Sequence, residues 1–138
     1  MINSRDINDL TPKTSELCRQ FIAKCKEQHI DVIITSTYRD AESQDSLYAQ
    51  GRTKPGNKVT NAKSGQSYHN FRIAFDFCPI VNGKAQWNDT ATFTKCGEIA
   101  ESVGLEWAGR WLRFKELAHC QLTGGLTLAQ LRENTATI

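Results

Sequence analysis

The sequence has no segment that would hold it in a membrane or direct it to export. Its 138 residues contain no apolar run near the ~20 residues that cross a bilayer. Residues 1–6 lack the apolar core of a signal peptide. These absences predict a protein made in the cytosol without stable membrane association. The length suits one domain with a packed core and is too short for two catalytic domains.

The five cysteines lack the pattern of a disulfide framework. They are an odd number at irregular spacings and include no CxxC pair. This pattern predicts reduced, mostly buried thiols. Cys120 adjoins His119 and could be proposed as a nucleophile or ligand. Neighbouring strand residues point to opposite faces, however, which favours a structural role for Cys120.

Acidic residues are missing from the stretch between Ser46 and Phe75. The net charge of +2 is too small to indicate nucleic-acid binding, and no ladder of aromatic residues accompanies the basic ones in this stretch. A basic stretch would attract a substrate that carries carboxylates. A solvated loop that aids solubility is the alternative. The five basic residues of the stretch are Arg52, Lys54, Lys58, Lys63 and Arg72.

Local signals predict an α+β fold in a single compact domain over residues 1–138, with helices packed on a small antiparallel sheet. The turn Asn82-Gly83 between two apolar segments predicts a hairpin. Residues 52–66 lack apolar periodicity and predict a long loop that borders the substrate. The expected helices span residues 11–28, 41–50, 89–103 and a short segment that begins at Thr127. The expected strands span residues 30–38, 75–81, 84–87 and 119–122.

Two of the three histidines belong to a pattern that predicts a zinc site. His69 and His119 offer imidazole nitrogens and Asp76 offers a carboxylate oxygen, which is the ligand set of a catalytic zinc whose fourth position is left to water. Glu116, three positions before His119, is the candidate general base. The remaining histidine, His29, is expected to end the first helix by pairing with its terminal carbonyls.

The spacing of the ligands differs from that of the HExxH zinc helix, which the sequence lacks. His69 and Asp76 are seven positions apart, too far for neighbours on one helical turn. A turn after His69 and a strand through residues 74–77 would bring both side chains inward. Asp76 is therefore expected on a strand of the antiparallel sheet.

These residues resemble the motifs of the LAS-type zinc peptidases. Ser67-x-His69, Ala74-x-Asp76 and an acidic residue three positions before His119 carry the resemblance. Further segments are similar to the branch of L-Ala-D-Glu endopeptidases, which includes bacterial cell-wall enzymes and phage endolysins. These segments are residues 35–39, 47–53, 59–62, 81–84, 104–107 and 119–122.

The resemblance implies a LAS/hedgehog-like fold and a role for each residue of the site. The three ligands would bind one zinc ion, with Glu116 as the general base. Arg39 would stabilise the oxyanion that develops on the scissile carbonyl, which suits a permanently charged guanidinium with five donors. Ser67 would donate a hydrogen bond near the substrate, and Gln44 would line the substrate site. Regulation by calcium stays an open question at this point.

The sequence departs from the family pattern at three places. Arg72 stands where relatives usually have a glycine, and Arg110 lies in Ala108-Gly109-Arg110-Trp111, where relatives often have Gly-Gly-Asp-Trp. Cys120 replaces an aromatic residue. The two arginines put long cations where relatives have compact or acidic residues, so the exact shape and charge of the cleft stay open at this point. Trp107 and Trp111 would either wall the cleft or pack in the core.

The predicted function is zinc-dependent cleavage of the L-Ala–D-Glu bond in the peptidoglycan stem peptide by a monomeric phage endolysin. Such a protein would be made in the host cytoplasm, leave it through a holin, and cause host lysis from the periplasm or cell wall. The sequence shows no separate cell-wall-binding domain. The alternatives are a D-Ala-D-Ala carboxypeptidase of the same fold, a non-catalytic wall-binding or metal-storing module, and a cysteine-dependent hydrolase.

Overall fold

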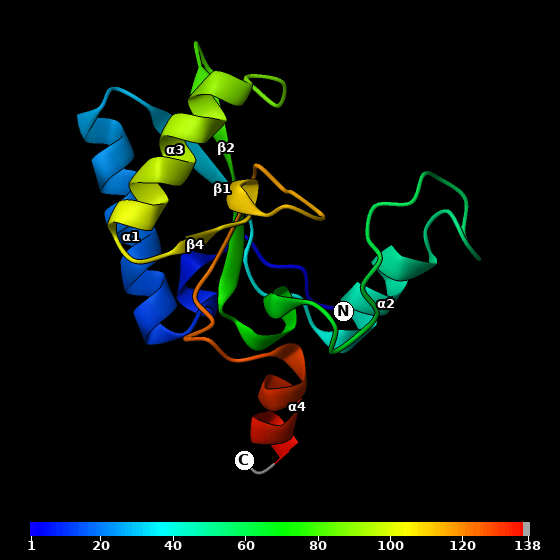
Figure 1. Ribbon diagram of the computed structural model, residues 1–138. Coiled ribbons are helices and arrows are strands. Elements are labelled where there is room, and N and C mark those ends of the chain that lie inside the picture. Colours follow the sequence, from blue (N-terminus) through cyan, green and yellow to red (C-terminus); the bar gives the residue numbers. More distant parts are fainter. Residues whose placement is uncertain (137–138) are drawn as a thin grey trace.

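The strand β2 (Ala74–Val81) lies at the centre of the computed structural model, which describes residues 1–136 of the chain. Within these residues, β2 belongs to a five-stranded antiparallel sheet of order β1-β2-β5-β4, with β3 paired to β2 (Figure 1). The other strands are β1 (Asp31–Ser36), β3 (Lys84–Ala85), β4 (Glu106–Trp107) and β5 (His119–Gln121). Together with the helices, this sheet confirms the predicted α+β fold.

The helices divide between the sheet and the segment that projects from it. Figure 1 shows α1 and α3 together on one side of the sheet, whereas α2 and the long loop after it project away from them. The α-helices among the described residues are α1 (Pro12–Glu27), α2 (Ala41–Ala49), α3 (Thr90–Ser102) and α4 (Leu128–Ala136). Short 3-10 helices occur at η1 (Ile7–Asp9), η2 (Tyr68–Phe71) and η3 (Ala108–Arg110).

Each α-helix begins at the capping residue that its sequence predicts. Thr11 accepts a hydrogen bond from the backbone N–H of Thr14, with Pro12 in the first turn of α1. Asp40 and Asp89 cap α2 and α3 in the same way. The side chains of Thr127 and Gln130 make reciprocal bonds to each other's backbone N–H, which is the capping box expected for α4.

Left-handed backbone residues end several elements. Asn82 and Gly83 both have positive φ, as the predicted two-residue hairpin between β2 and β3 requires. The strand β3 is shorter than expected because the chain already turns at residues 87–88 toward the cap of α3. His29 ends α1 through its own backbone, with φ of 61° and its N–H bonded to the carbonyl of Lys26.

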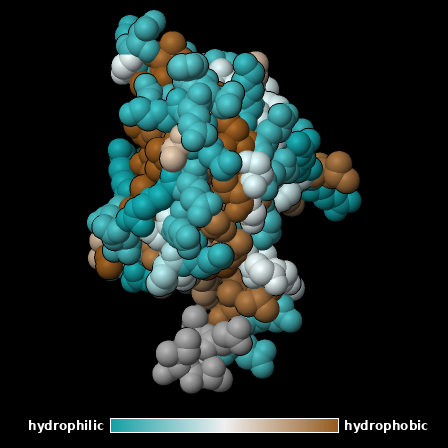
Figure 2. All heavy atoms as spheres, turned by 90° about the vertical axis from the view of Figure 1, so that its left-hand side faces the viewer, coloured by the Kyte–Doolittle hydropathy of each residue, from teal (hydrophilic) through white to brown (hydrophobic). Residues whose placement is uncertain are grey.

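Aromatic rings from three elements form the core between the sheet and the helices. Phe21 of α1 packs against Phe75 and Phe77 of β2, and Phe77 packs against Phe93 of α3, with ring centroids 5.0–5.7 Å apart. The five cysteines are free and buried, which confirms the prediction of reduced core thiols. Figure 2 views the side formed by α1 and α3, where hydrophilic side chains cover most of the surface.

Candidate active site

The pairing of the central strands determines where the predicted ligands lie. Asp76 of β2 is the register partner of His119 on β5 and of Ser36 on β1. His69 lies on η2, which begins where Ser67 accepts a hydrogen bond from the backbone N–H of His69 at 3.2 Å. The short helix therefore brings His69 over the strand that carries Asp76.

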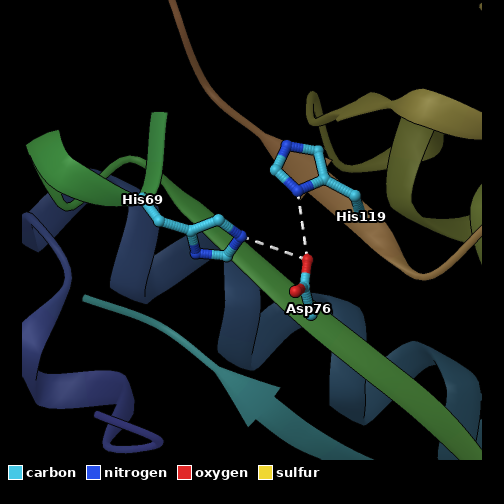
Figure 3. Close-up of side chains that lie close together, drawn as sticks. All are labelled: His69, Asp76 and His119. Atoms are coloured by element: carbon cyan, nitrogen blue, oxygen red, sulfur yellow. Dashed lines mark hydrogen bonds and ion pairs between the residues drawn. The ribbon is translucent and has the colours of Figure 1, made fainter. Parts of the chain in front are cut away.

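The three predicted ligands converge on one point (Figure 3). Oδ1 of Asp76 lies 3.2 Å from Nε2 of His69 and 3.0 Å from Nδ1 of His119. One potential ligand atom from each residue lies within 4.8 Å of the others. Both histidines are buried, whereas the Asp76 side chain stays 28% exposed toward the cleft. Two imidazoles and a carboxylate at this spacing suit a tetrahedral zinc ion with one open position.

Each imidazole is oriented by a second acceptor. Nδ1–H of His69 donates to the backbone carbonyl of Thr37 at 2.8 Å, which leaves Nε2 free for a metal. Nε2–H of His119 donates to Oε1 of Gln121 at 2.9 Å, which leaves Nδ1 free. The two histidines therefore offer opposite ring nitrogens. Gln121 is in turn bonded to Glu106, so the chain of polar groups continues across β4 and β5.

Electrostatics favour an ionised carboxylate between the two rings. Burial opposes the charge of Asp76, but the neighbouring imidazoles of His69 and His119 outweigh burial and hold the pKa of Asp76 well below its ordinary value. Burial lowers the pKa of His69. Burial also opposes a charge on His119, yet its bonds to Asp76 and Gln121 raise the pKa of His119 above the ordinary value. A cation would favour neutral imidazoles at both positions.

The predicted general base and the predicted oxyanion-stabilising residue flank the ligands. Oε2 of Glu116 lies 3.8 Å from Nδ1 of His119, and the Glu116 side chain is 61% exposed. Nη2 of Arg39 lies 4.0 Å from Oδ2 of Asp76. Burial lowers the pKa of Arg39 against the opposing effect of Asp76 and Glu116, and a guanidinium stays charged all the same. Ser67 also lines the cleft, and its hydrogen bond to the substrate stays a prediction.

Gln44 is the site residue whose position differs from the prediction. It was expected to line the substrate site, but it is fully buried and is absent from the cleft wall. Its side chain accepts a hydrogen bond from Nη1 of Arg39 at 3.0 Å and donates to the carbonyl of Ala62 at 2.8 Å. The reason is that α2 turns Gln44 inward, beneath Arg39, where its amide satisfies buried polar groups.

A comparison with protein-family models identifies the family of the chain. The model of the VanY family, described as D-alanyl-D-alanine carboxypeptidase, matches residues 7–116. The chain belongs to the VanY family. The matched segment contains His69, Asp76 and Glu116, and the strand pairing of β5 adds His119.

Relatives and solved structures agree with this family. The peptidoglycan L-alanyl-D-glutamate endopeptidase CwlK of Bacillus subtilis (strain 168) is 38% identical over 130 residues, covering 83% of this chain and 74% of CwlK. The crystal structure of the Serratia marcescens L-Ala D-Glu endopeptidase ChiX has a TM-score of 0.66 at 16% identity, over 88% of this chain and 89% of ChiX. The D,D-pentapeptidase VanY of a VanB-type resistance cassette, solved in complex with Zn(II), has a TM-score of 0.65 at 15% identity, over 96% of this chain and 89% of that one.

Family membership and the converging ligands together confirm two predictions. The chain is a metallopeptidase of the VanY family, and His69, Asp76 and His119 form its zinc site. The likeness to the solved structures confirms the predicted fold. Among residues 1–136, no helix has the length and apolar character needed to cross a membrane.

The zinc site lies in a cleft of about 1240 Å³. One wall is the long loop at residues 58–62, which confirms that this loop borders the site. Trp111 also lines the cleft, near His119, with ring centroids 5.9 Å apart. Trp107 is instead a core residue, and its Nε1–H donates to the carbonyl of Leu117. The two tryptophans therefore divide between the two roles that the sequence left open.

Most of the basic stretch does not face the cleft. Arg52 donates to the carbonyls of Tyr48 and Thr60 and lies over the Tyr48 ring. Lys54 donates to Oγ of Ser46. Among the five basic residues of the stretch, Lys58 lines the cleft. A field that attracts carboxylates would therefore come from the cations that line the cleft, Arg39, Lys58 and Arg132, more than from the stretch as a whole.

The three departures from the family pattern leave the cleft intact. Arg72 has φ of 65°, the left-handed conformation that explains a glycine in relatives, and its guanidinium packs 3.8 Å over the Tyr38 ring. Arg110 forms a forked ion pair with Glu101. Neither arginine lines the cleft, which answers the question that the sequence left open. Burial raises the pKa of the Cys120 thiol well above its ordinary value, which argues against a nucleophile there.

Sequence reasoning missed two residues that support the site. Gln121 orients His119, and its signal in the sequence is the spacing of two on a strand, which puts both side chains on one face. Asn70 donates from Nδ2 to the carbonyl of Arg39, while its Oδ1 accepts from the backbone N–H groups of Gly65 and Ser67. The bond to Ser67 belongs to the capping box of η2, which is a local signal, whereas the bond to Arg39 joins segments far apart in the sequence.

Proposed function

We propose that the protein is a zinc-dependent peptidoglycan endopeptidase that hydrolyses the L-Ala–D-Glu bond of the stem peptide. The observation that carries the proposal is the convergence of His69, Asp76 and His119 in a cleft that also holds Glu116 and Arg39. The choice of bond is supported by the 38% identity to CwlK, whose name states this activity.

Different side chains of the cleft have different roles in hydrolysis. A bound zinc ion supplies Lewis-acid chemistry, since it lowers the pKa of a water and polarises a carbonyl. Glu116 would accept a proton from the attacking water and return it to the departing amine, and its position in the cleft, with Oε2 3.8 Å from Nδ1 of His119, supports this role. Arg39 donates hydrogen bonds to the carbonyl oxygen as that oxygen gains charge. Thr37 and Gln121 keep the two imidazoles in the required tautomers.

The biological role that we propose is lysis of a bacterial host by a phage endolysin. The support is the resemblance of the motifs at residues 35–39, 47–53 and 59–62 to the branch of L-Ala-D-Glu endopeptidases, which includes phage endolysins. The protein would act on the cell wall from the periplasmic side after release by a holin. Expression in a bacterium with and without a holin tests this role, and lysis that does not depend on the holin would contradict it.

Digestion of purified muropeptides, followed by mass spectrometry, tests the scissile bond. The expected products are L-alanyl fragments and peptides with a new N-terminal D-Glu. The description of the VanY family favours a second candidate, a D-Ala-D-Ala carboxypeptidase. Release of terminal D-Ala alone would support this second candidate and contradict the endopeptidase proposal.

Replacement of the general base separates an enzyme from a wall-binding module. Glu116→Ala should retain zinc and lose about 10²–10⁴-fold in activity, because general acid–base catalysis contributes that much. Glu98→Ala, on the exposed face of α3, is the matched control and should leave activity near the wild-type value. Removal of zinc with a chelator should abolish activity in the wild type. A protein whose effect on cell walls survives both treatments is not the proposed enzyme.

A further inference from the structure

Gln44 is a buried amide with a partner for each of its polar atoms. The residue lies in α2 and is completely shielded from solvent. Oε1 accepts from Nη1 of Arg39 at 3.0 Å and lies 3.4 Å from Nδ2 of Asn70. Nε2 donates to the carbonyl of Ala62 at 2.8 Å. The donors on one side and the acceptor on the other fix the orientation of the amide.

The two ends of this amide bond to two residues that line the cleft. Arg39 and Ala62 both line it, although Gln44 between them does not. Asn70 holds the backbone carbonyl of Arg39 at 3.0 Å, and the backbone N–H of Arg39 donates to the carbonyl of His69 at 3.2 Å. With its backbone bonded on both sides, the guanidinium of Arg39 still needs a partner to select one rotamer. Gln44 provides that partner.

The neighbouring carboxylate shows why the position of the guanidinium matters. Nη2 of Arg39 lies 4.0 Å from Oδ2 of Asp76, while Nη1 is held by Gln44. A guanidinium freed from Gln44 can close this gap and form a direct ion pair with a zinc ligand. In that pose it would turn its donors away from the substrate carbonyl.

We infer that Gln44 is a positioning residue that couples the guanidinium of Arg39 to the long loop at Ala62, so that a substrate held by the loop meets an oriented Arg39. The inference rests on the proposed function, in which Arg39 stabilises the oxyanion. It assigns Gln44 an effect on kcat, because a group that acts only in the transition state changes kcat more than KM.

Gln44→Met tests this role, since methionine has a similar length and no hydrogen-bonding amide. We expect kcat for stem-peptide cleavage to fall by roughly 10²-fold, the cost of a misplacement of about 1 Å, with a smaller change in KM. The matched control is Gln50→Met. Gln50 also links α2 to the long loop, through Nε2 and the carbonyl of Asn57, but neither Gln50 nor Asn57 lines the cleft. The control should keep kcat near the wild-type value.

A double-mutant cycle distinguishes positioning from a general structural effect. If Gln44 acts through Arg39, Gln44→Met should lower kcat in the wild type and have little further effect in Arg39→Ala. An equal loss of kcat in both backgrounds would overturn the inference. Zinc content and thermal unfolding of each variant show whether it is folded. If Gln44→Met does not fold, Gln44→Glu enters the same cycle, because it keeps an acceptor for Arg39.

Hydrogen exchange provides a readout that does not depend on activity. Residues 62–67 should exchange faster in Gln44→Met than in Gln50→Met, because only Gln44 holds the loop at Ala62. Equal exchange in the two variants would contradict the coupling to the loop. If the wild type cleaves no L-Ala–D-Glu bond, the proposed function fails. If the wild type is active but Gln44→Met lowers kcat by the same factor with and without Arg39→Ala, only the inferred role of Gln44 fails.

Discussion

Helices α1 and α2 are held in place by different forces. The buried face of α1 includes Leu17, Phe21 and Cys25, and these side chains join the core against β2 and α3. The buried residues of α2 are Ser43 and Gln44. Hydrogen bonds therefore hold α2 in place, whereas apolar contacts hold α1 in place.

The polar side chains of α2 bond mainly to the long loop beside the cleft. Asp45 accepts from the backbone N–H of Ser64, and Ser46 accepts from Lys54. Gln50 donates to the carbonyl of Asn57. Each such bond contributes about 0.5–1.5 kcal/mol, less than the burial of a large apolar side chain. The difference teaches that α1 secures the fold, whereas α2 secures the shape of the cleft.

A truncation in α1 should have the largest effect on stability. Phe21→Ala removes a fully buried ring that contacts Phe75 and Phe77, and we expect it to lower the free energy of unfolding by about 3–5 kcal/mol. Because no atom of Phe21 lines the cleft, kcat per folded molecule should stay close to that of the wild type. Urea unfolding, together with kcat for the folded fraction, measures both quantities. A large loss of kcat without a loss of stability would break the comparison between the two helices.

The elements could be predicted from the sequence because their signals are local. Apolar spacing and the Thr11-Pro12 start define α1, and Asn82-Gly83 defines the hairpin. The ligands His69, Asp76 and His119 were also predictable, because two imidazoles and a carboxylate are the ligand set of a catalytic zinc ion and lie in short sequence motifs.

The sequence could not predict the interactions that depend on tertiary neighbours. The choice of Nε2 in His69 and Nδ1 in His119 follows from Thr37 and Gln121, which the fold brings to the opposite ring nitrogens. A glutamine on a helix without a strong apolar face is expected to be exposed. No local signal in the sequence therefore predicts that Gln44 is buried beneath Arg39. The basic stretch looked like one surface, although side-chain bonds turn most of its charges away from the cleft.

Replacement of Gln121 tests whether polar support matters in the sheet as it does in α2. Gln121→Met removes the acceptor of Nε2–H of His119, and we expect about 10–100-fold weaker zinc binding, the usual cost of losing such a partner. Competition with a chelating dye measures the affinity. Gln86→Met, at a partly buried glutamine after β3, is the control and should bind zinc as the wild type does, because Gln86 does not line the cleft. Unchanged affinity in Gln121→Met would confine the importance of polar support to α2 and its loop.

The smallest effect is expected at Lys58, on the loop that α2 holds. Lys58 lines the cleft, whereas Lys54 is bonded to Ser46 on α2. If Lys58 attracts the carboxylates of the stem peptide, Lys58→Gln should raise KM a few-fold at low salt and leave kcat and stability unchanged. The difference from the wild type should vanish near 1 M salt, where the screening length falls to about 3 Å. Lys54→Gln has the same change in net charge and should have a weaker effect on KM. Equal effects of the two variants would mean that the charge of the loop acts as a whole, and that the positions set by α2 do not select which cation the substrate meets.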